Sequence, residues 1–215
     1  MNVVAVIQAR MGSKRFPGKS MAELNGRPLV QWCIERALAA KGVGRVALAI
    51  PEGPADDILD YAFRLHRKLT VVRGSETNVQ ARFLLAASVT RASVLVRITA
   101  DQPFIRSETI GRVVAEVKAG SDYAGALEVP PGFIVEAFTV AHLRDVSEGG
   151  ATHMEQEHVA LRMRPTHVEA MAYPEGMNLS IDRIDDLFRC RRCLKHFDRE
   201  DFTEQEAIDA WENYK

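Results

Sequence analysis

The sequence predicts a single α/β domain with a mostly parallel sheet and helices on both of its faces. Short apolar runs rich in valine and isoleucine alternate with longer helical patterns up to about residue 118, which is the rhythm of βαβ units. The chain has 215 residues, enough for one such domain, and it contains no internal repeat or low-complexity tract. Hydrophobic residues make up 47% and charged residues 27%, a balance that fits an ordinary globular fold.

The first predicted unit is a strand, a loop and a helix. Residues 2–8 (NVVAVIQ) form a short apolar run, which is typical of a strand buried on both faces of a parallel sheet. A polar, basic loop follows over residues 9–19. Residues 28–40 have a helical pattern, and Pro28 is tolerated in the first turn of a helix.

Two further units continue the alternation. Residues 45–50 (RVALAI) predict a strand, Pro54 opens a helix that runs to about residue 66, and residues 69–72 predict a short strand. A helix over residues 78–89 then leads to an apolar strand over residues 93–98 (SVLVRI). Ligands of such sheets bind beyond the carboxyl ends of the strands, so the loops that follow these ends are the first candidates for a site.

The pattern changes after residue 120. Residues 120–175 combine β-prone stretches with Pro130, Pro131 and Gly132, and we expect them to form an insertion, either an antiparallel lobe or a dimer arm. Thr203 and Glu206 form a capping-box pattern. The later expected elements are a helix over 153–163, strands over 167–172 and 178–181, and helices over 183–197 and 203–214.

Charge and composition exclude some classes of protein. The formal net charge is −1, which argues against nucleic-acid binding through an overall basic surface. No apolar run approaches the roughly 20 residues that a membrane helix needs. The N-terminus has its apolar part before its basic part, the reverse of a secretory signal, so we expect a cytoplasmic protein.

Three cysteines fit a reducing compartment. Cys190 and Cys193 form a CxxC pair followed by His196, which leaves two interpretations. The pair could bind a metal or act in redox chemistry, or it could simply face the core from one helix. The second interpretation is favoured because the chain has no second ligand pair.

The loop from Ala9 to Lys19 carries four cations and no acid. Glycines allow backbone conformations that other residues resist, and exposed amide groups together with cations can bind an anion such as a triphosphate. The spacing matches neither a Walker A loop nor a GxGxxG motif. A solvated basic loop is the alternative, but the position after the first strand favours phosphate binding. The residues concerned are Arg10, Gly12, Lys14, Arg15, Gly18 and Lys19.

Two aspartates are candidate ligands of Mg²⁺. Asp101 follows the strand over 93–98, and Asp182 follows the expected strand over 178–181. If those strands are neighbours, the two carboxylates converge near the basic loop, and two carboxylates suffice for a Mg²⁺ ion that also binds phosphate and water. Alternatively, Asp101 could serve a turn before Pro103, and Asp182 could cap the next helix.

Several segments in order resemble a known family. Residues 7–19 (IQARMGSKRFPGK) are similar to the opening motif of sugar-activating nucleotidyltransferases, above all the cytidylyltransferases of the spore-coat polysaccharide type, which are related to the synthetases of CMP-sialate and CMP-3-deoxy-manno-octulosonate. The similarity extends over almost the whole chain. Further matching segments are residues 26–37, 72–79, 94–105, 155–159 and 179–187.

This resemblance implies a Rossmann-like nucleotidyltransferase fold, also found in nucleotide-diphospho-sugar transferases, with a dimerisation insertion. It implies a Mg²⁺-dependent homodimer that transfers CMP from CTP to a small acidic sugar and releases pyrophosphate. The implied metal ligands are Asp101 and Asp182, and the implied catalytic residues are Arg10, Lys19 and Asp101. The implied nucleotide-binding residues are Gln8, Ala9, Arg10, Met11, Gly12, Ser13, Lys14, Arg15, Lys19, Arg82 and Thr99.

The sequence leaves two interpretations open for several residues that the resemblance places at the acceptor site. Arg97 could be a buried ion-pair partner or a ligand contact. Glu157 and His158 line the acceptor pocket by resemblance, or else form an exposed first helical turn. The implied acceptor-binding residues are Arg97, Gln102, Glu136, Glu157 and His158.

The chain departs from the family pattern at four positions. Ala81 and Ile134 stand where an aspartate is usual, Ala100 replaces a glycine and Gln102 replaces a cysteine. These changes put the base and the acceptor in question, and an apolar Ile134 should disfavour a polyol that needs an acid there. Two other functions stay open, a catalytically weak nucleotide-binding homologue and an NDP-sugar glycosyltransferase. The latter commonly has an Asp-x-Asp motif, which is absent after Asp101.

Overall fold

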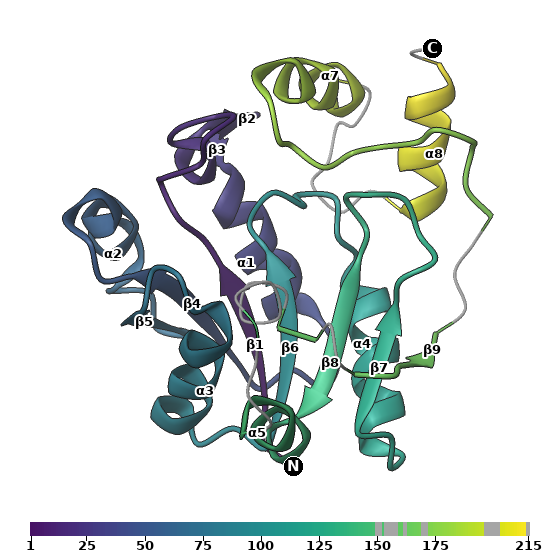
Figure 1. The fold of residues 1–215 in the computed structure, drawn as a ribbon. Helices are drawn as coiled ribbons and strands as arrows, with labels where there is room; N and C mark the ends of the chain where they lie inside the picture. The colour runs from purple at the N-terminus through teal and green to yellow at the C-terminus, as the bar shows by residue number, and fades with distance from the viewer. Residues whose placement is uncertain (149–151, 153–158, 161–162, 169–171, 196–202, 214–215) are drawn as a thin grey trace.

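A computed structural model describes residues 1–148, 152, 159–160, 163–168, 172–195 and 203–213. Its centre is a seven-stranded sheet in the order β5-β4-β1-β6-β8-β7-β9 (Figure 1). Strands β5, β4, β1 and β6 are parallel, whereas β8 runs antiparallel to both β6 and β7. The strands are β1 (Val3–Gln8), β4 (Arg45–Pro51), β5 (Leu69–Gly74), β6 (Val94–Thr99), β7 (Tyr123–Ala126), β8 (Val135–Thr139) and β9 (Thr166–His167).

Helices cover both faces of this sheet, as the sequence predicts. One face packs against buried side chains of α1 (Leu29–Ala39), α2 (Asp57–Phe63) and α4 (Ser107–Lys118). The other packs against α3 (Val79–Thr90) and α5 (Val140–Glu148). Apolar side chains of successive residues in β1 and β6 alternate between these two cores, so both strands are buried except at Gln8, Arg97 and Thr99, which are half-buried. No helix in the described ranges is long and apolar enough to cross a membrane.

A third apolar cluster lies above the carboxyl edge of the sheet. It joins α7 (Ile184–Leu194) and α8 (Glu204–Glu212) to the short hairpin of β2 (Glu23–Leu24) and β3 (Arg27–Pro28) (Figure 1). The predicted capping box starts α8, because the Glu206 backbone N–H donates to the Thr203 hydroxyl at 3.1 Å and the Thr203 N–H donates back to the Glu206 carboxylate at 2.5 Å.

The CxxC pair belongs to this cluster. Cys190 and Cys193 are buried on the inner side of α7, and burial raises the pKa of both thiols. Within the described ranges no group of three or more side chains could hold a metal ion on its own. Both side chains therefore face the apolar cluster from one helix, as the second interpretation predicts, and His196 lies outside the described residues.

The first half of the chain follows the sequence prediction closely, and the second half less so. The strand expected over 178–181 is wrong, because this segment forms no strand and its amides bond to carbonyls of loop residues. The helix expected over 153–163 lies mostly outside the described residues, and Val159 and Ala160 form a bend. The strand expected over 167–172 is limited to β9, with 169–171 outside the described ranges. The β2–β3 hairpin and α5 had no sequence prediction. The described strands of the 120–175 segment extend the main sheet, and its role in dimerisation stays a prediction.

Gly132 lies close to the backbone of Leu179 and Ser180. Its φ is 110°, and an added Cβ would lie 2.6 Å from the carbonyl carbon of Leu179 and 2.8 Å from the amide nitrogen of Ser180. We therefore expect Gly132→Ala to lower the free energy of unfolding by at least about 2 kcal/mol, through backbone strain and a clash with backbone atoms. Urea denaturation measures this loss.

Gly53 provides the matched control, since its φ is −63° and nothing lies within 4 Å of an added Cβ. Gly53→Ala should change the free energy of unfolding by less than about 0.5 kcal/mol. Equal urea midpoints for the two variants would contradict the close approach of Gly132 to Leu179.

Candidate active site

A cavity of about 740 Å³ opens where β1 and β6 end. These two parallel neighbours mark the point at which the strand order reverses, the usual ligand site of an open α/β sheet. A smaller hollow of about 510 Å³ lies elsewhere and is lined by none of the predicted site residues. The predicted residues that line the larger cavity are Gln8, Ala9, Arg10, Ser13, Lys14, Arg15, Lys19, Arg82, Thr99, Asp101 and Asp182.

The basic loop is held in shape by the backbone of Met11. The Met11 carbonyl accepts hydrogen bonds from the amides of Ser13 (3.0 Å) and Gly18 (2.9 Å), which closes the loop on itself. Gly18 has a φ of 78°, a left-handed conformation that favours glycine. The Ser20 hydroxyl donates to the Arg10 carbonyl at 3.0 Å. Met11 itself therefore shapes the loop, and it does not line the cavity.

Asp56 anchors this loop from outside it. Its carboxylate accepts a 2.6 Å hydrogen bond from the Met11 amide, 45 residues away in sequence. The residue is 5% exposed, and burial raises the pKa of its carboxyl despite that hydrogen bond. Asp56 had no place in the sequence prediction. The available signal was its position just after the carboxyl end of β4, at the same edge of the sheet as the loop.

We expect Asp56→Leu to raise the KM for an anionic substrate bound by this loop at least about tenfold, because one charge-assisted hydrogen bond to the loop is lost. Asp56→Asn should stay within about threefold of the wild type, since the amide oxygen can still accept from Met11. Steady-state kinetics measures both values, and melting temperatures show whether each variant is folded. A normal KM in folded Asp56→Leu would contradict the anchoring role.

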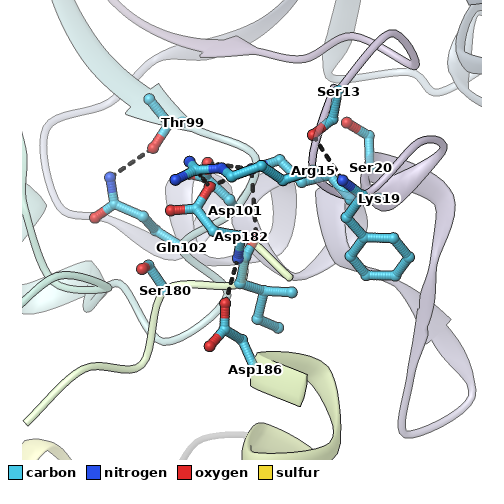
Figure 2. A network of polar contacts seen from close by, with 12 residues as sticks. Ser13, Arg15, Lys19, Ser20, Thr99, Asp101, Gln102, Ser180, Asp182 and Asp186 are labelled. Atoms are coloured by element: carbon cyan, nitrogen blue, oxygen red, sulfur yellow. Dashed lines mark hydrogen bonds and ion pairs between the residues drawn. The ribbon is translucent and has the colours of Figure 1, made fainter. Parts of the chain in front are cut away.

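Two aspartates and one lysine form the centre of the cavity (Figure 2). The Lys19 ammonium lies 2.7 Å from Asp101 Oδ2 and 3.0 Å from Asp182 Oδ1, and it also donates to the Ile181 carbonyl at 3.2 Å. The Arg15 guanidinium contacts the same oxygen of Asp182 at 2.9 Å. Residues from three distant parts of the sequence thus converge on one point, although Asp182 is not carried there by the strand on which the sequence prediction depended.

The segment before Asp182 reaches this point through backbone hydrogen bonds rather than a strand. The Ile181 amide donates to the Asp101 carbonyl at 2.9 Å, and the Leu179 amide donates to the Pro131 carbonyl at 2.8 Å. The end of β6 and the loop around Pro131 therefore fix the position of Asp182. The close approach of Gly132 to Leu179 and Ser180 therefore helps to hold the segment that carries Asp182 in place.

The helix-capping interpretation of Asp182 is not what the structure shows. Arg183 is the N-cap residue of α7, and the carboxylate of Asp186, at the third helical position, accepts from the amides of Asp182 (2.9 Å) and Arg183 (2.8 Å). Burial alone would raise the pKa of Asp186, but these two amides and the nearby Arg189 outweigh it and lower the pKa. The Asp182 carboxylate is left to face Lys19 and Arg15.

The charges around the cavity favour an anion. Five cationic side chains line it against three carboxylates. Arg82 is 3% exposed, and burial followed by repulsion from Arg10 lowers the pKa of its guanidinium. A ligand that carries several negative charges would relieve this repulsion between cations. The cations are Arg10, Lys14, Arg15, Lys19 and Arg82, and the carboxylates are Glu76, Asp101 and Asp182.

Some predicted residues lie outside the cavity. Gly12 does not line it. Arg97 is paired with the Glu136 carboxylate, and the Gln102 amide donates to the Thr99 hydroxyl at 2.6 Å. Glu157 and His158 lie outside the described residues. The sequence prediction missed several residues that line the cavity. They follow the carboxyl ends of β5 and β6 or the basic loop, and this position at the ligand-binding edge of the sheet could have identified them. They are Ser20, Glu76, Thr77, Val79 and Ala100.

The donor set suits a divalent cation that also binds phosphate. Two carboxylates approach one ammonium within 3.0 Å, which shows that the point between them accommodates a positive charge. Mg²⁺ prefers oxygen ligands and commonly takes one or two carboxylates together with substrate phosphates and water. The residues present therefore fit such an ion, with Asp101 and Asp182 as its protein ligands.

Comparisons with known proteins show the family to which the chain belongs. The family model described as Cytidylyltransferase matches residues 4–174. The spore coat polysaccharide biosynthesis protein SpsF of Bacillus subtilis is 34% identical over 169 residues, which cover 76% of this chain and 70% of that protein. The 3-deoxy-manno-octulosonate cytidylyltransferase of Anaeromyxobacter dehalogenans is 35% identical over 121 residues, 55% of this chain and 48% of that enzyme.

A solved structure has the same architecture. The cytidylyltransferase from Leptospira borgpetersenii serovar Hardjo-bovis superposes with a TM-score of 0.92 at 23% identity, over 100% of this chain and 95% of that one. The predicted Rossmann-like nucleotidyltransferase fold is thus confirmed. Because the family model spans most of the sequence and SpsF is similar over three quarters of it, the chain belongs to the cytidylyltransferase family of nucleotidyltransferases.

Proposed function

We propose that this enzyme transfers CMP from CTP to a small acidic sugar and releases pyrophosphate, with Mg²⁺ as the metal ion. The observation that carries the proposal is the convergence of Lys19 on Asp101 and Asp182 inside a cavity rich in cations. The names of the similar spore-coat and 3-deoxy-manno-octulosonate proteins support a sugar acceptor and a cytidine nucleotide.

The chemistry requires little more than positioning and charge neutralisation. The oxygen of an acceptor hydroxyl attacks the α-phosphorus of CTP, the bond from this phosphorus to the oxygen that bridges the α- and β-phosphates breaks, and pyrophosphate leaves while the hydroxyl proton passes to water. Arg10, Arg15 and Lys19 bind the phosphates and neutralise the charge that grows on the leaving group. A Mg²⁺ ion held by Asp101 and Asp182 would polarise phosphate oxygens when bound.

Pyrophosphate release tests the proposal. The protein is incubated with each of the four NTPs in turn, Mg²⁺ and a panel of acidic sugars, and Asp101→Asn serves as the inactive control. We expect release with CTP and at least one acidic sugar. If CTP binds but no pair of NTP and acceptor yields pyrophosphate, the protein is better described as a catalytically weak nucleotide-binding homologue. The departures from the family pattern at Ala81 and Ile134 are the reason to consider this alternative.

The proposal also covers the cellular location and the oligomeric state of the protein. Three free, buried cysteines support a reducing compartment, and we propose the cytoplasm. We also propose a homodimer, formed through part of residues 120–175. Light scattering of the purified protein tests the second point.

A further inference from the structure

A line of four polar side chains crosses the sheet beside the cavity. Gln8 on β1, Arg97 on β6, Glu136 on β8 and Tyr123 on β7 are linked in this order. Arg97 Nε donates to Gln8 Oε1 at 3.1 Å, Arg97 Nη1 pairs with one oxygen of Glu136, and the Tyr123 hydroxyl donates to the other oxygen at 2.5 Å. Of the four, only Gln8 lines the cavity.

The guanidinium determines which way the Gln8 amide points. Arg97 has only hydrogen-bond donors, so it must face the oxygen of the amide and not the nitrogen. Arg97 uses one lone pair of Oε1, and the NH₂ group of Gln8 keeps both of its hydrogens for a ligand. A free glutamine could turn its amide over and offer either atom, and this one cannot without losing its bond to Arg97.

Glu136 and Tyr123 in turn fix Arg97. Glu136 is 6% exposed, and a buried carboxylate needs a partner of opposite charge, which Arg97 supplies. Burial and the Glu136 charge both raise the pKa of Tyr123, so its hydroxyl stays protonated and serves as the donor. Register pairing places Arg97 opposite Glu136 across β6 and β8, which keeps the pair on one face.

We infer that Gln8 is a specificity-determining residue that donates its amide hydrogens to an accepting oxygen or nitrogen of a substrate, and that Arg97, Glu136 and Tyr123 are positioning residues for it. The inference rests on the proposed function and deepens it. It also gives Arg97 and Glu136 a different role from the sequence prediction, because they act through Gln8 instead of touching the acceptor.

Steady-state kinetics with Gln8→Glu tests the donor itself. Glutamate has nearly the same shape and still pairs with Arg97, but it offers no hydrogen to the substrate. We expect KM for one of the two substrates to rise about tenfold or more, the effect of one lost hydrogen bond, while the melting temperature is retained. The substrate whose KM changes is the one that Gln8 contacts. Unchanged KM values for both would overturn the inference.

A double-mutant cycle tests the positioning chain. Tyr123→Phe and Glu136→Gln should each raise the same KM in the wild type, and neither should raise it further once Gln8→Ala is present. Equal increases in both backgrounds would overturn the chain, since they would show an effect that does not pass through Gln8. Tyr123→Phe keeps the charge pair of Arg97 and Glu136, so it remains informative if Glu136→Gln fails to fold.

The activity of the wild type distinguishes a failure of the proposed function from a failure of the inference about Gln8. An inactive wild-type enzyme would remove the proposed function and this inference together. An active wild type with additive effects in the cycle would remove the inference alone.

Discussion

Replacing Asp101 with asparagine will lower kcat by more than about a hundredfold, the scale of loss when one positioned electrostatic group is removed from an active site. Asp101 lies directly after β6, and its carboxylate is one of the two that contact Lys19 in the cavity. Asparagine keeps the shape but removes the negative charge, so it weakens both the metal site and the position of Lys19. Initial rates of pyrophosphate release at saturating CTP and acceptor measure the effect.

A surface aspartate gives the control for this substitution. Asp145 is exposed on α5 and does not line the cavity, so Asp145→Asn should retain the wild-type rate. A rate for Asp101→Asn within about threefold of the wild type would refute the proposed role of Asp101, since charge at that position would then matter little to the transition state.

The second large effect is expected from Lys19→Met, which should also lower kcat by more than about a hundredfold. The Lys19 side chain is 15% exposed and makes three contacts with Asp101, Asp182 and the Ile181 carbonyl. Methionine fills a similar volume without charge. The loss therefore leaves two partly buried carboxylates close together and removes a cation from the phosphates. The same pyrophosphate assay applies.

Lys68 is the matched control, because it is exposed and lies outside the cavity. Lys68→Met should have a normal rate and a normal melting temperature. If Lys19→Met were folded and as active as Lys68→Met, the basic loop would have to act through other cations, and the assignment of Lys19 would be wrong.

The sequence predicts the parallel part of the fold well, for a physical reason. Strands such as β1 and β6 are buried on both faces, so their sequences are almost continuously apolar and stand out from the amphipathic helices between them. Loops at the carboxyl edge of such a sheet gather the ligand-binding residues. The basic loop and Asp101 could therefore be placed in one site before the structure was known.

Tertiary interactions decide what the sequence could not predict. The segment before Asp182 looks like a strand, but its amides bond to the carbonyls of Asp101 and Pro131 instead of a sheet. The two-residue strands β2 and β3 are too short to leave a periodic pattern. The Arg97 partner depends on β8 lying beside β6, which no local signal indicates. The partner of Asp56 is also distant in sequence, since its bond to Met11 spans 45 residues.

The most direct test of the account is a crystal structure of the protein with CTP and Mn²⁺, in which anomalous scattering locates the metal. The account predicts an anomalous peak coordinated by both Asp101 and Asp182, with the triphosphate bound to the loop from Ala9 to Lys19. A metal ion bound elsewhere, or phosphates that make no contact with this loop, would contradict it.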